Sequence, residues 1–394
     1  MPAGSAAGSA ALLELIPSAA RRLVLAGRPQ ASESPAATGG PAPATEPKEL
    51  LLALVEAVAR AAGLEVLRAN PHFLPASEWT PELAVAHFAS LEVACPVPVA
   101  RNVMLLDGED MLGLAEERRA GDQRGIRAQR LALMDRVLTV APALALNGLL
   151  PEGAAWPPLQ VAPVPLEPLL EQADRGLRAE GAARPIQWLA CEQDTGPYNF
   201  LQLRREARLG SSHLRVLTGA AEDGAERRPI LVAFATPGTL GELGPALRTF
   251  AALGAEARGG LLFVLFFGSP ADFASAVAER PHALFFGDNF RCPDIRILFG
   301  PFGAAEVLDA VRQATVCLDT CYGGVLDGLA RRMGIGNRIV LGPDGSFDAW
   351  AAGEAVAGGI AWDRALDAGT LTRRHLKANR AGERPLASTL ARML

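Results

Sequence analysis

The chain has 394 residues, of which 49% are hydrophobic and 21% are charged, and its formal net charge is −5. This length and composition predict a globular protein of two domains rather than one. Acidic and basic residues are interleaved throughout, which excludes the basic face that a nucleic-acid-binding protein presents. We therefore expect no nucleic-acid partner.

The lysine and cysteine content, together with the N-terminus, indicates where in the cell the protein is expected. Of the 38 basic residues only Lys48 and Lys377 are lysines, a bias typical of a GC-rich bacterial genome rather than of an arginine-based binding strategy. The cysteines fit no zinc-binding spacing and are expected to be free thiols: Cys95, Cys191, Cys292, Cys317 and Cys321. The N-terminus lacks the basic leader of an export signal, and the longest apolar run is too short to span a bilayer. These features predict a cytoplasmic protein without a transmembrane segment, with peripheral membrane contact left open.

The first half of the chain alternates strands and helices after an N-terminal extension over residues 1–20. RRLVLAG (21–27) predicts a buried strand, and a loop containing Gly39-Gly40 follows it. KELLLALVEAVARAAG (48–63) has the apolar spacing of a helix and ends on a glycine suited to a C-cap. A charged helix is expected over 109–134, and further strands at 64–71, 82–88, 99–108, 135–142 and 159–168. The pattern predicts a parallel α/β sheet, and a first domain over residues 21–168.

The same alternation returns after residues 169–184, which are polar and helix-prone and predict a hinge. Strands are expected at 186–192, 213–219, 230–238, 261–268, 295–302, 315–320 and 338–343. Helical segments lie between them and end the chain, so the second domain extends over 185–394. The predicted fold class is α/β, with two Rossmann-like domains whose parallel sheets face a central cleft.

Three strand-to-helix turns of the second half carry glycines: ATPGTLGEL (235–243), FGPFGAAE (299–306) and DTCYGGVLDG (319–328). In α/β sheets ligands bind beyond the carboxyl ends of the strands, where glycines permit close approach and the first amides of a helix attract an anion. Each turn alone is more simply explained as the end of a strand. Together they predict an anionic ligand, and a nucleotide diphosphate can be held in this way without a lysine. The residues expected to hold it are Thr236, Gly238, Thr239, Tyr322, Gly323, Gly324 and Asp327.

The second half also resembles the donor-binding domain of GT-B-fold glycosyltransferases. The similarity lies in IRILFGPFGAAEVLDAVRQATVCLDT and MGIGNRIV, which are closest to the O-linked N-acetylglucosamine transferase and SPINDLY type. In the first half, LVLAG, TGG and LLLALVEAVARAAGLEVL resemble the opening strand, glycine loop and helix of that fold, and MDRVLTVAPALALNGLLP resembles its strand before the hinge. The resemblance implies a nucleotide-sugar donor, such as a UDP- or GDP-sugar, and no metal or other cofactor.

The sequence departs from that family at the donor site. The turn CYGGVLD is shorter than the family's histidine- and threonine-bearing turn. Asp319 and Asp327 stand where retaining members carry two glutamates, so Asp327 is expected either to bind a ribose or merely to favour the helix dipole. The ATPGTLGEL turn lacks the cation that relatives use for the diphosphate. Arg296, with Arg291 and Arg338 as alternatives, is expected to replace it, or all three are solvated.

The first half is expected to supply the acceptor side and, if the enzyme inverts, a general base. His87 ends the strand ELAVAHF, and Asp107 ends the next strand. The simpler reading of His87 is a hydrogen-bonded core residue, and that of Asp107 a helix cap. Tyr322 similarly is either a stacking partner of the base or part of the turn's packing.

The sequence therefore predicts a metal-independent glycosyltransferase of hexosyl or N-acetylhexosaminyl type. Its acceptor would be a glycan, a lipid or a protein side chain. A catalytically degenerate binding or scaffold protein remains an alternative, favoured by the missing cation. A sugar-nucleotide epimerase would use the same architecture, whereas a two-lobed solute-binding protein would need an export signal.

Overall fold

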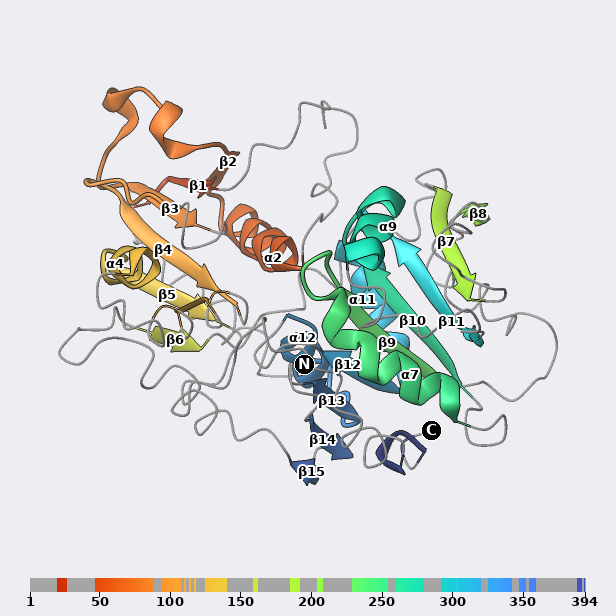
Figure 1. The fold of residues 1–394 in the computed structure, drawn as a ribbon. Helices are drawn as coiled ribbons and strands as arrows, with labels where there is room; N and C mark the ends of the chain where they lie inside the picture. The colour runs from red at the N-terminus through yellow and green to blue at the C-terminus, as the bar shows by residue number, and fades with distance from the viewer. Residues whose placement is uncertain are drawn as a thin grey trace.

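The fold contains two β-sheets, one from each half of the chain (Figure 1). The computed structural model describes residues 20–26, 47–87, 94–107, 110, 113–114, 117, 125–139, 159–161, 185–191, 204–207, 229–253, 260–279, 292–302, 304–319, 325–341, 347–351, 354–358, 388–391 and 393. The predicted hinge (169–184) and the predicted strand at 213–219 lie outside these residues. The first sheet ends at Val161 and the second begins at Pro185.

The first sheet has six strands, all parallel, in the order β2-β1-β3-β4-β5-β6. They are β1 (Arg22–Ala26), β2 (Glu65–Arg68), β3 (Leu83–His87), β4 (Arg101–Leu106), β5 (Arg136–Thr139) and β6 (Leu159–Val161). The short helices η1 (Pro71–Phe73), η2 (Ala76–Glu78) and α4 (Ile126–Ala132) lie between them in the chain. This order is that of the flavodoxin-like doubly wound fold.

The second sheet has nine strands in the order β15-β14-β13-β12-β9-β10-β11-β7-β8. Its parallel centre consists of β9 (Ile230–Ala235), β10 (Leu261–Phe266), β11 (Cys292–Phe299), β12 (Val316–Asp319) and β13 (Arg338–Leu341). Counted along the chain, these five strands follow the order 3-2-1-4-5 of a Rossmann sheet. Their runs ILVAFA and LLFVLF are buried at every position, as a sheet covered on both faces requires.

The edges of the second sheet correct the prediction of a wholly parallel sheet. On one side β7 (Pro185–Cys191) and β8 (Arg204–Ala207) are antiparallel, and on the other β14 (Phe347–Ala351) and β15 (Glu354–Gly358) are antiparallel. The sequence analysis predicted no strand at β8, β14 or β15. Each edge depends on pairing with a neighbouring strand, which local apolar periodicity does not report.

Helices cover both faces of the second sheet. The side chains of Leu231, Ala233 and Phe266 pack on the face that carries α7 (Gly244–Ala252), after the short helix η5 (Leu240–Leu243), and α9 (Pro270–Glu279). Val232 and Phe263 point to the other face, which carries α11 (Ala304–Gln313) and α12 (Val325–Arg332). This alternation with a period of two fixes a three-layer α/β/α unit.

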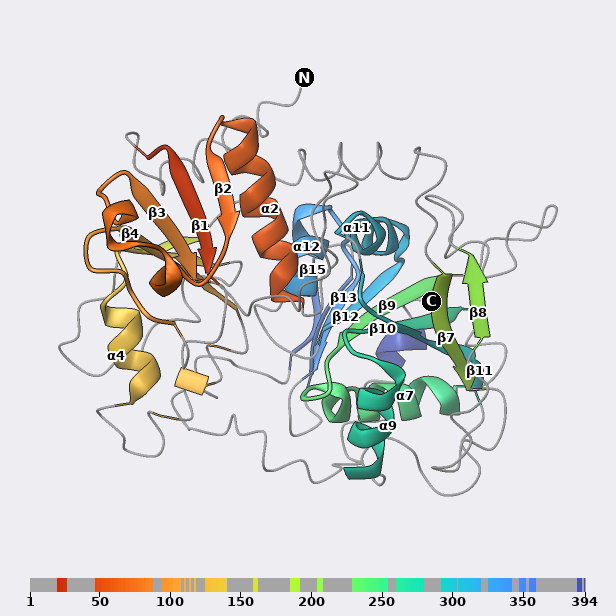
Figure 2. The same ribbon diagram turned by 90° about the horizontal axis from the view of Figure 1, so that it is seen from above.

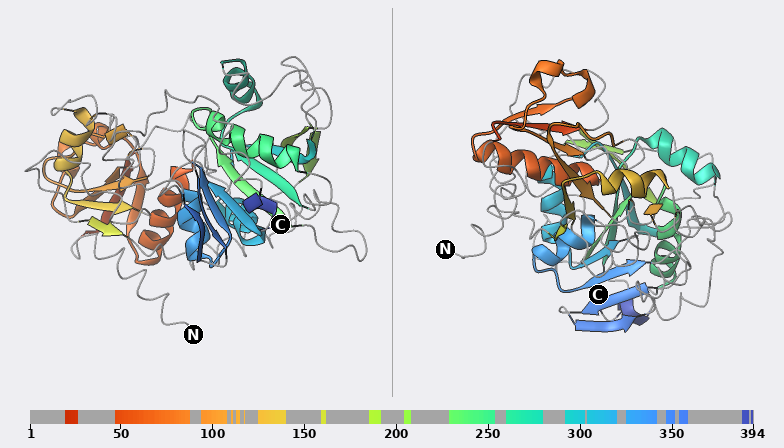
Figure 3. Two further views of the ribbon diagram at one scale, coloured as in Figure 1. Left: turned by 60° about the horizontal axis from the view of Figure 1, so that its bottom comes forward. Right: turned by 90° about the vertical axis from the view of Figure 1, so that its left-hand side faces the viewer.

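Helix α2 (Lys48–Ala61) joins the two units (Figures 1, 2 and 3). Its residues Leu52, Val55 and Val58 pack on the first sheet, whereas Leu51 and Ala53 belong to the core of the second unit, where α2 contacts α12. The helix ends at Ala61, and Gly63, the glycine predicted to terminate it, has a φ of +80° that suits glycine and closes the C-terminal turn. Because α2 buries side chains on both sides, it fixes how the two sheets sit together.

Candidate functional site

The strand order of each sheet reverses direction at one point, and five of the predicted site residues lie near these points: His87, Thr236, Gly238, Thr239 and Asp327. In the second sheet the chain proceeds from β9 through β10 to β11 on one side, and from β12 to β13 on the other. The carboxyl ends of β9 and β12 are therefore neighbours that lead to helices on opposite faces. Doubly wound sheets bind ligands at this kind of position. The turn that starts at Thr236 and the loop that starts after Asp319 both leave from it.

The β9 turn is closed by a pair of threonines. The Thr236 and Thr239 hydroxyls lie 3.2 Å apart, the Thr236 amide donates to Thr239 Oγ1 at 3.0 Å, and the Thr239 amide donates to the Thr236 carbonyl at 3.1 Å. The Leu240 amide also donates to the Thr236 carbonyl, at 2.9 Å. The two threonines thus hold the shape of the turn, and their amides are already used within it.

Gly238 is exposed at the tip of this turn. Pro237 has no amide hydrogen, and within the described part of the chain the Gly238 amide makes no hydrogen bond. A Cβ atom added at Gly238 would meet only the Thr236 hydroxyl, at 3.7 Å, which is ordinary van der Waals contact. The turn therefore offers one open backbone donor, and a side chain can be placed there without displacing the structure.

Asp319, at the end of β12, caps helix α12. Its Oδ2 atom accepts from the Asp327 amide at 2.7 Å, and the carboxylate is 6% exposed. This satisfies one of the free amides of the helix and places negative charge at the positive end of its dipole. The predicted residues Tyr322, Gly323 and Gly324 lie in the loop between Asp319 and α12 and outside the described residues.

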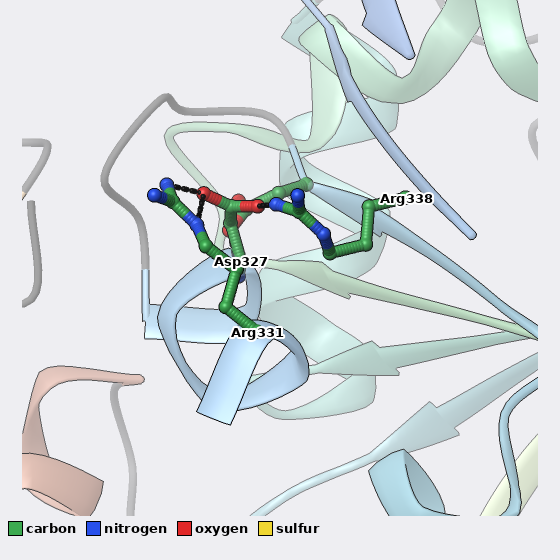
Figure 4. Close-up of polar contacts among 4 residues, drawn as sticks. Asp327, Arg331 and Arg338 are labelled. Carbon is green, nitrogen blue, oxygen red and sulfur yellow. Dashed lines mark hydrogen bonds and ion pairs between the residues drawn. The ribbon is translucent and has the colours of Figure 1, made fainter. Parts of the chain in front are cut away.

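Asp327 is the centre of a buried ion network (Figure 4). Its Oδ2 atom accepts from Nε of Arg331 at 2.9 Å and from the Nη2 atom of the same side chain, and its Oδ1 atom accepts from Nη1 of Arg338. Asp327 is 1% exposed. Arg338 also lies over the Trp350 ring, 4.6 Å from its centroid. Oδ1 therefore connects α12 to the start of β13, whereas Oδ2 pairs with Arg331 one turn further along α12 itself. The ribose-binding role of Asp327 stays a prediction.

The buried thiol of Cys317, the β12 residue opposite Arg338, lies beside this network. Burial, with Asp319 and Asp327 nearby, raises the pKa of Cys317 to about 12. We expect Cys317 to resist alkylation by iodoacetamide at pH 8, because only the thiolate reacts, while the exposed Cys95 is modified. Peptide mass spectrometry after brief labelling checks this, and equal labelling of the two cysteines would contradict it.

Arg296, expected to replace the missing cation, lies in the middle of β11. It stands opposite Phe263 and three residues before the end of the strand at Phe299. Strand β10 separates it from β9. At about 3.3 Å per residue and about 4.8 Å per strand, this position lies roughly 10 Å below the carboxyl edge and roughly 10 Å across the sheet. Arg291 lies outside the described residues, and Arg338, opposite Cys317 of β12, pairs with Asp327 together with Arg331.

In the first sheet the reversal lies between β1 and β3, and His87 stands there as the last residue of β3, opposite Ala26. Its ring is 2% exposed, and its Nε2 atom lies 3.1 Å from Oδ1 of Asn102. Burial lowers the pKa of His87, against the opposing effect of the hydrogen bond to Asn102. The imidazole is therefore neutral at neutral pH.

Asp107 follows β4 at the same edge and acts as a cap. Its Oδ1 atom accepts from the Asp110 amide at 3.0 Å. Asp110 in turn forms a buried ion pair with Lys48, the first residue of α2. The pair ties the start of α2 to the carboxyl edge of the first sheet. The sequence analysis missed it, although the rarity of lysine in this arginine-rich chain was a usable signal.

The two reversals thus differ in what they present: an open backbone amide follows β9 in the second sheet, and a neutral histidine ends β3 in the first. Backbone amides bind anions such as a diphosphate, and a neutral imidazole can accept a proton. Among the described residues no group of three or more metal-ligating side chains comes together. In the same part of the chain, no helix has the length and apolarity needed to cross a membrane.

No protein-family model matches the sequence, and no curated protein is similar to it. Among solved structures, the N-terminal domain of Candida albicans trehalose-6-phosphate phosphatase is similar, with 9% identity, a TM-score of 0.36, and coverage of 95% of this chain and 92% of that chain. Trehalose-phosphate synthases from Burkholderia multivorans (10% identity, TM-score 0.35, coverage 87% and 70%) and Burkholderia vietnamiensis (10%, 0.34, 87% and 74%) are also similar. Because these TM-scores lie below 0.5, the fold rests on the strand order and register of this chain itself.

Proposed function

We propose that the protein is a cytoplasmic, metal-independent glycosyltransferase that moves a hexosyl or N-acetylhexosaminyl group from a nucleotide-sugar to an acceptor hydroxyl or side chain. The observation that carries the proposal is the reversal of strand order between β12 and β9, which places the start of the Thr236–Thr239 turn beside the carboxyl end of β12. The donor pyrophosphate would lie there, with the Gly238 amide among its hydrogen-bond donors.

The first sheet would hold the acceptor. In an inverting reaction the acceptor hydroxyl loses a proton as it attacks the anomeric carbon, and the bond from that carbon to the donor phosphate breaks. His87 would take this proton, for which it must be neutral. The role requires the acceptor to reach a ring that is 2% exposed. Asp107 would act indirectly, by holding the chain at the end of β4 through its bond to the Asp110 amide.

A catalytically inactive binding or scaffold protein is the second candidate. The observation that favours it is that Asp327 is 1% exposed and that both its oxygens accept from Arg331 and Arg338, which disfavours contact with a ribose. Such a protein would bind a nucleotide-sugar or a related anion without turning it over, or would bind none.

Thermal unfolding with UDP- and GDP-sugars separates the two candidates. A donor present at 100 times its Kd stabilises the folded state by about 2.7 kcal/mol, which raises the melting temperature measurably. We expect stabilisation by one of the two nucleotide classes, with slow release of the free nucleoside diphosphate as the donor is hydrolysed. Stabilisation without hydrolysis or transfer would favour the binding protein. No response to either class would contradict both the transferase and the nucleotide-binding alternative.

A further inference from the structure

The bond between His87 and Asn102 determines which nitrogen of the imidazole carries the proton. The tautomer of a histidine and the orientation of an asparagine amide are assigned from the surrounding donors and acceptors. Asn102 is the second residue of β4 and lies opposite Val85, on the strand that ends at His87. Its side chain is enclosed by backbone groups whose roles are fixed.

The orientation of the Asn102 amide follows from three of these groups. One side-chain atom lies 2.9 Å from the Val97 amide, which can only donate, so this atom is the oxygen. The other lies 2.9 Å from the Val97 carbonyl and 2.9 Å from the Ala100 carbonyl, which can only accept, so it is the nitrogen. A flipped amide would oppose all three contacts. Oδ1 is therefore the atom that faces His87.

The backbone of Asn102 is anchored as well. Its amide donates to Oδ2 of Asp135 at 2.7 Å, and its carbonyl accepts from the Asp135 amide at 2.9 Å. Asn102 is 4% exposed. With both its backbone and its side chain held, the residue presents a fixed acceptor to the imidazole.

We infer that Asn102 is a positioning residue that fixes His87 as the Nε2–H tautomer and so makes Nδ1 the nitrogen that accepts a proton. An amide oxygen can only accept, so the Nε2 atom at 3.1 Å must donate to it. In the neutral ring the remaining lone pair then belongs to Nδ1. The assignment of Nδ1 as the base of sugar transfer rests on the proposed function, whereas the tautomer itself does not.

The neutral state of the ring has a separate cause. Desolvation disfavours the charged imidazolium, and the nearby His72 also lowers the pKa of His87. Burial therefore removes the second proton, and Asn102 selects which nitrogen keeps the first.

Nitrogen NMR of the full-length protein, labelled with 15N-histidine, tests the inference without any activity. The chain has five histidines, and the signal of His87 is identified by its loss in His87→Gln. Glutamine is the matched replacement, because its side-chain amide can donate to Asn102 Oδ1 as Nε2–H does. Long-range 15N–1H correlations distinguish the two ring nitrogens. We expect the proton on Nε2 alone at pH 7; a proton on Nδ1, a mixture of tautomers or an imidazolium would overturn the inference.

Two substitutions of Asn102 separate selection of the tautomer from packing. Asn102→Asp keeps an acceptor for His87 and adds a negative charge, so His87 should remain Nε2–H and titrate at a higher pH than in the wild type. Asn102→Ala removes the acceptor, so a mixture of tautomers is expected, and an unchanged single tautomer would overturn the role of Asn102.

If a donor is turned over, His87→Gln should lower kcat by about 100-fold or more with little effect on the donor KM. If His87 does not carry its proton on Nε2 alone, the inference about Asn102 is rejected. If kcat is unchanged in His87→Gln, His87 is rejected as the base, and the tautomer assignment is unaffected.

Discussion

Replacement of Asp327 by asparagine is expected to cost about 3–5 kcal/mol of stability. The carboxylate is 1% exposed and pairs with Arg331 and Arg338. The Arg338 side chain is itself 10% exposed, so the variant leaves a guanidinium buried without its counter-charge. Stacking on Trp350 supplies only part of the lost stabilisation. For a unit of this size the cost corresponds to a fall in melting temperature of about 6–20 °C, measurable by calorimetry.

The matched control for Asp327 is Glu65→Gln. Glu65 also forms an ion pair, with Arg22, but the two side chains are 54% and 31% exposed. A solvent-exposed pair is worth about 0–1 kcal/mol, so the melting temperature should hardly move. Equal effects of the two substitutions would show that the Asp327 network is not buried as described.

Replacement of Lys48 by methionine is expected to destabilise the first sheet unit by about 3 kcal/mol. Methionine matches the length of lysine without its charge, and the ion pair that it removes has side chains that are 7% and 5% exposed. The carboxylate of Asp110 would then lie buried without this lysine. Hydrogen exchange of the β3 and β4 amides reports the stability of this unit separately from that of the second sheet.

The double variant Lys48→Met with Asp110→Leu tests the same ion pair by removing both of its charges. Apolar replacement of both partners is often neutral or stabilising, so the double variant should recover much of the stability lost in Lys48→Met. The single variant Asp110→Leu is measured as well. If the stability lost in the double variant equals the sum of the losses in Lys48→Met and Asp110→Leu, a direct interaction between the two side chains is contradicted.

The central strands of both sheets follow from the sequence because their signal is local. Continuous apolar runs such as ILVAFA and LLFVLF predict strands that are buried on both faces, and these runs form β9 and β10. The termination of α2 by Gly63, which follows the C-cap residue, was predicted for the same reason. The hairpin of β14 and β15 was missed because its strands are specified by their antiparallel pairing, starting from β13, and not by their own periodicity.

The partners of the site residues could not be predicted from the sequence. Asp327 and Arg331 are four residues apart on one helix, a spacing that indicates an ion pair from the sequence alone. Arg338, however, reaches the same carboxylate from the next strand. Likewise His87 was identified as a candidate, yet its partner Asn102 lies 15 residues away on a neighbouring strand. A side chain's neighbours in the fold decide whether it faces a ligand or a counter-charge, and spacing alone does not contain them.

The central claim is that a pyrophosphate binds at the reversal of the second sheet through backbone amides, including that of Gly238. Affinity for a nucleoside diphosphate, measured by calorimetry in Gly238→Asp and Gly238→Asn, tests this most directly. The two side chains have the same size, and the position has room for either, since an added Cβ meets only ordinary contact at 3.7 Å. We predict binding at least tenfold weaker with the carboxylate than with the amide, a difference that shrinks as salt is raised. Equal affinity of the two variants would contradict the claim.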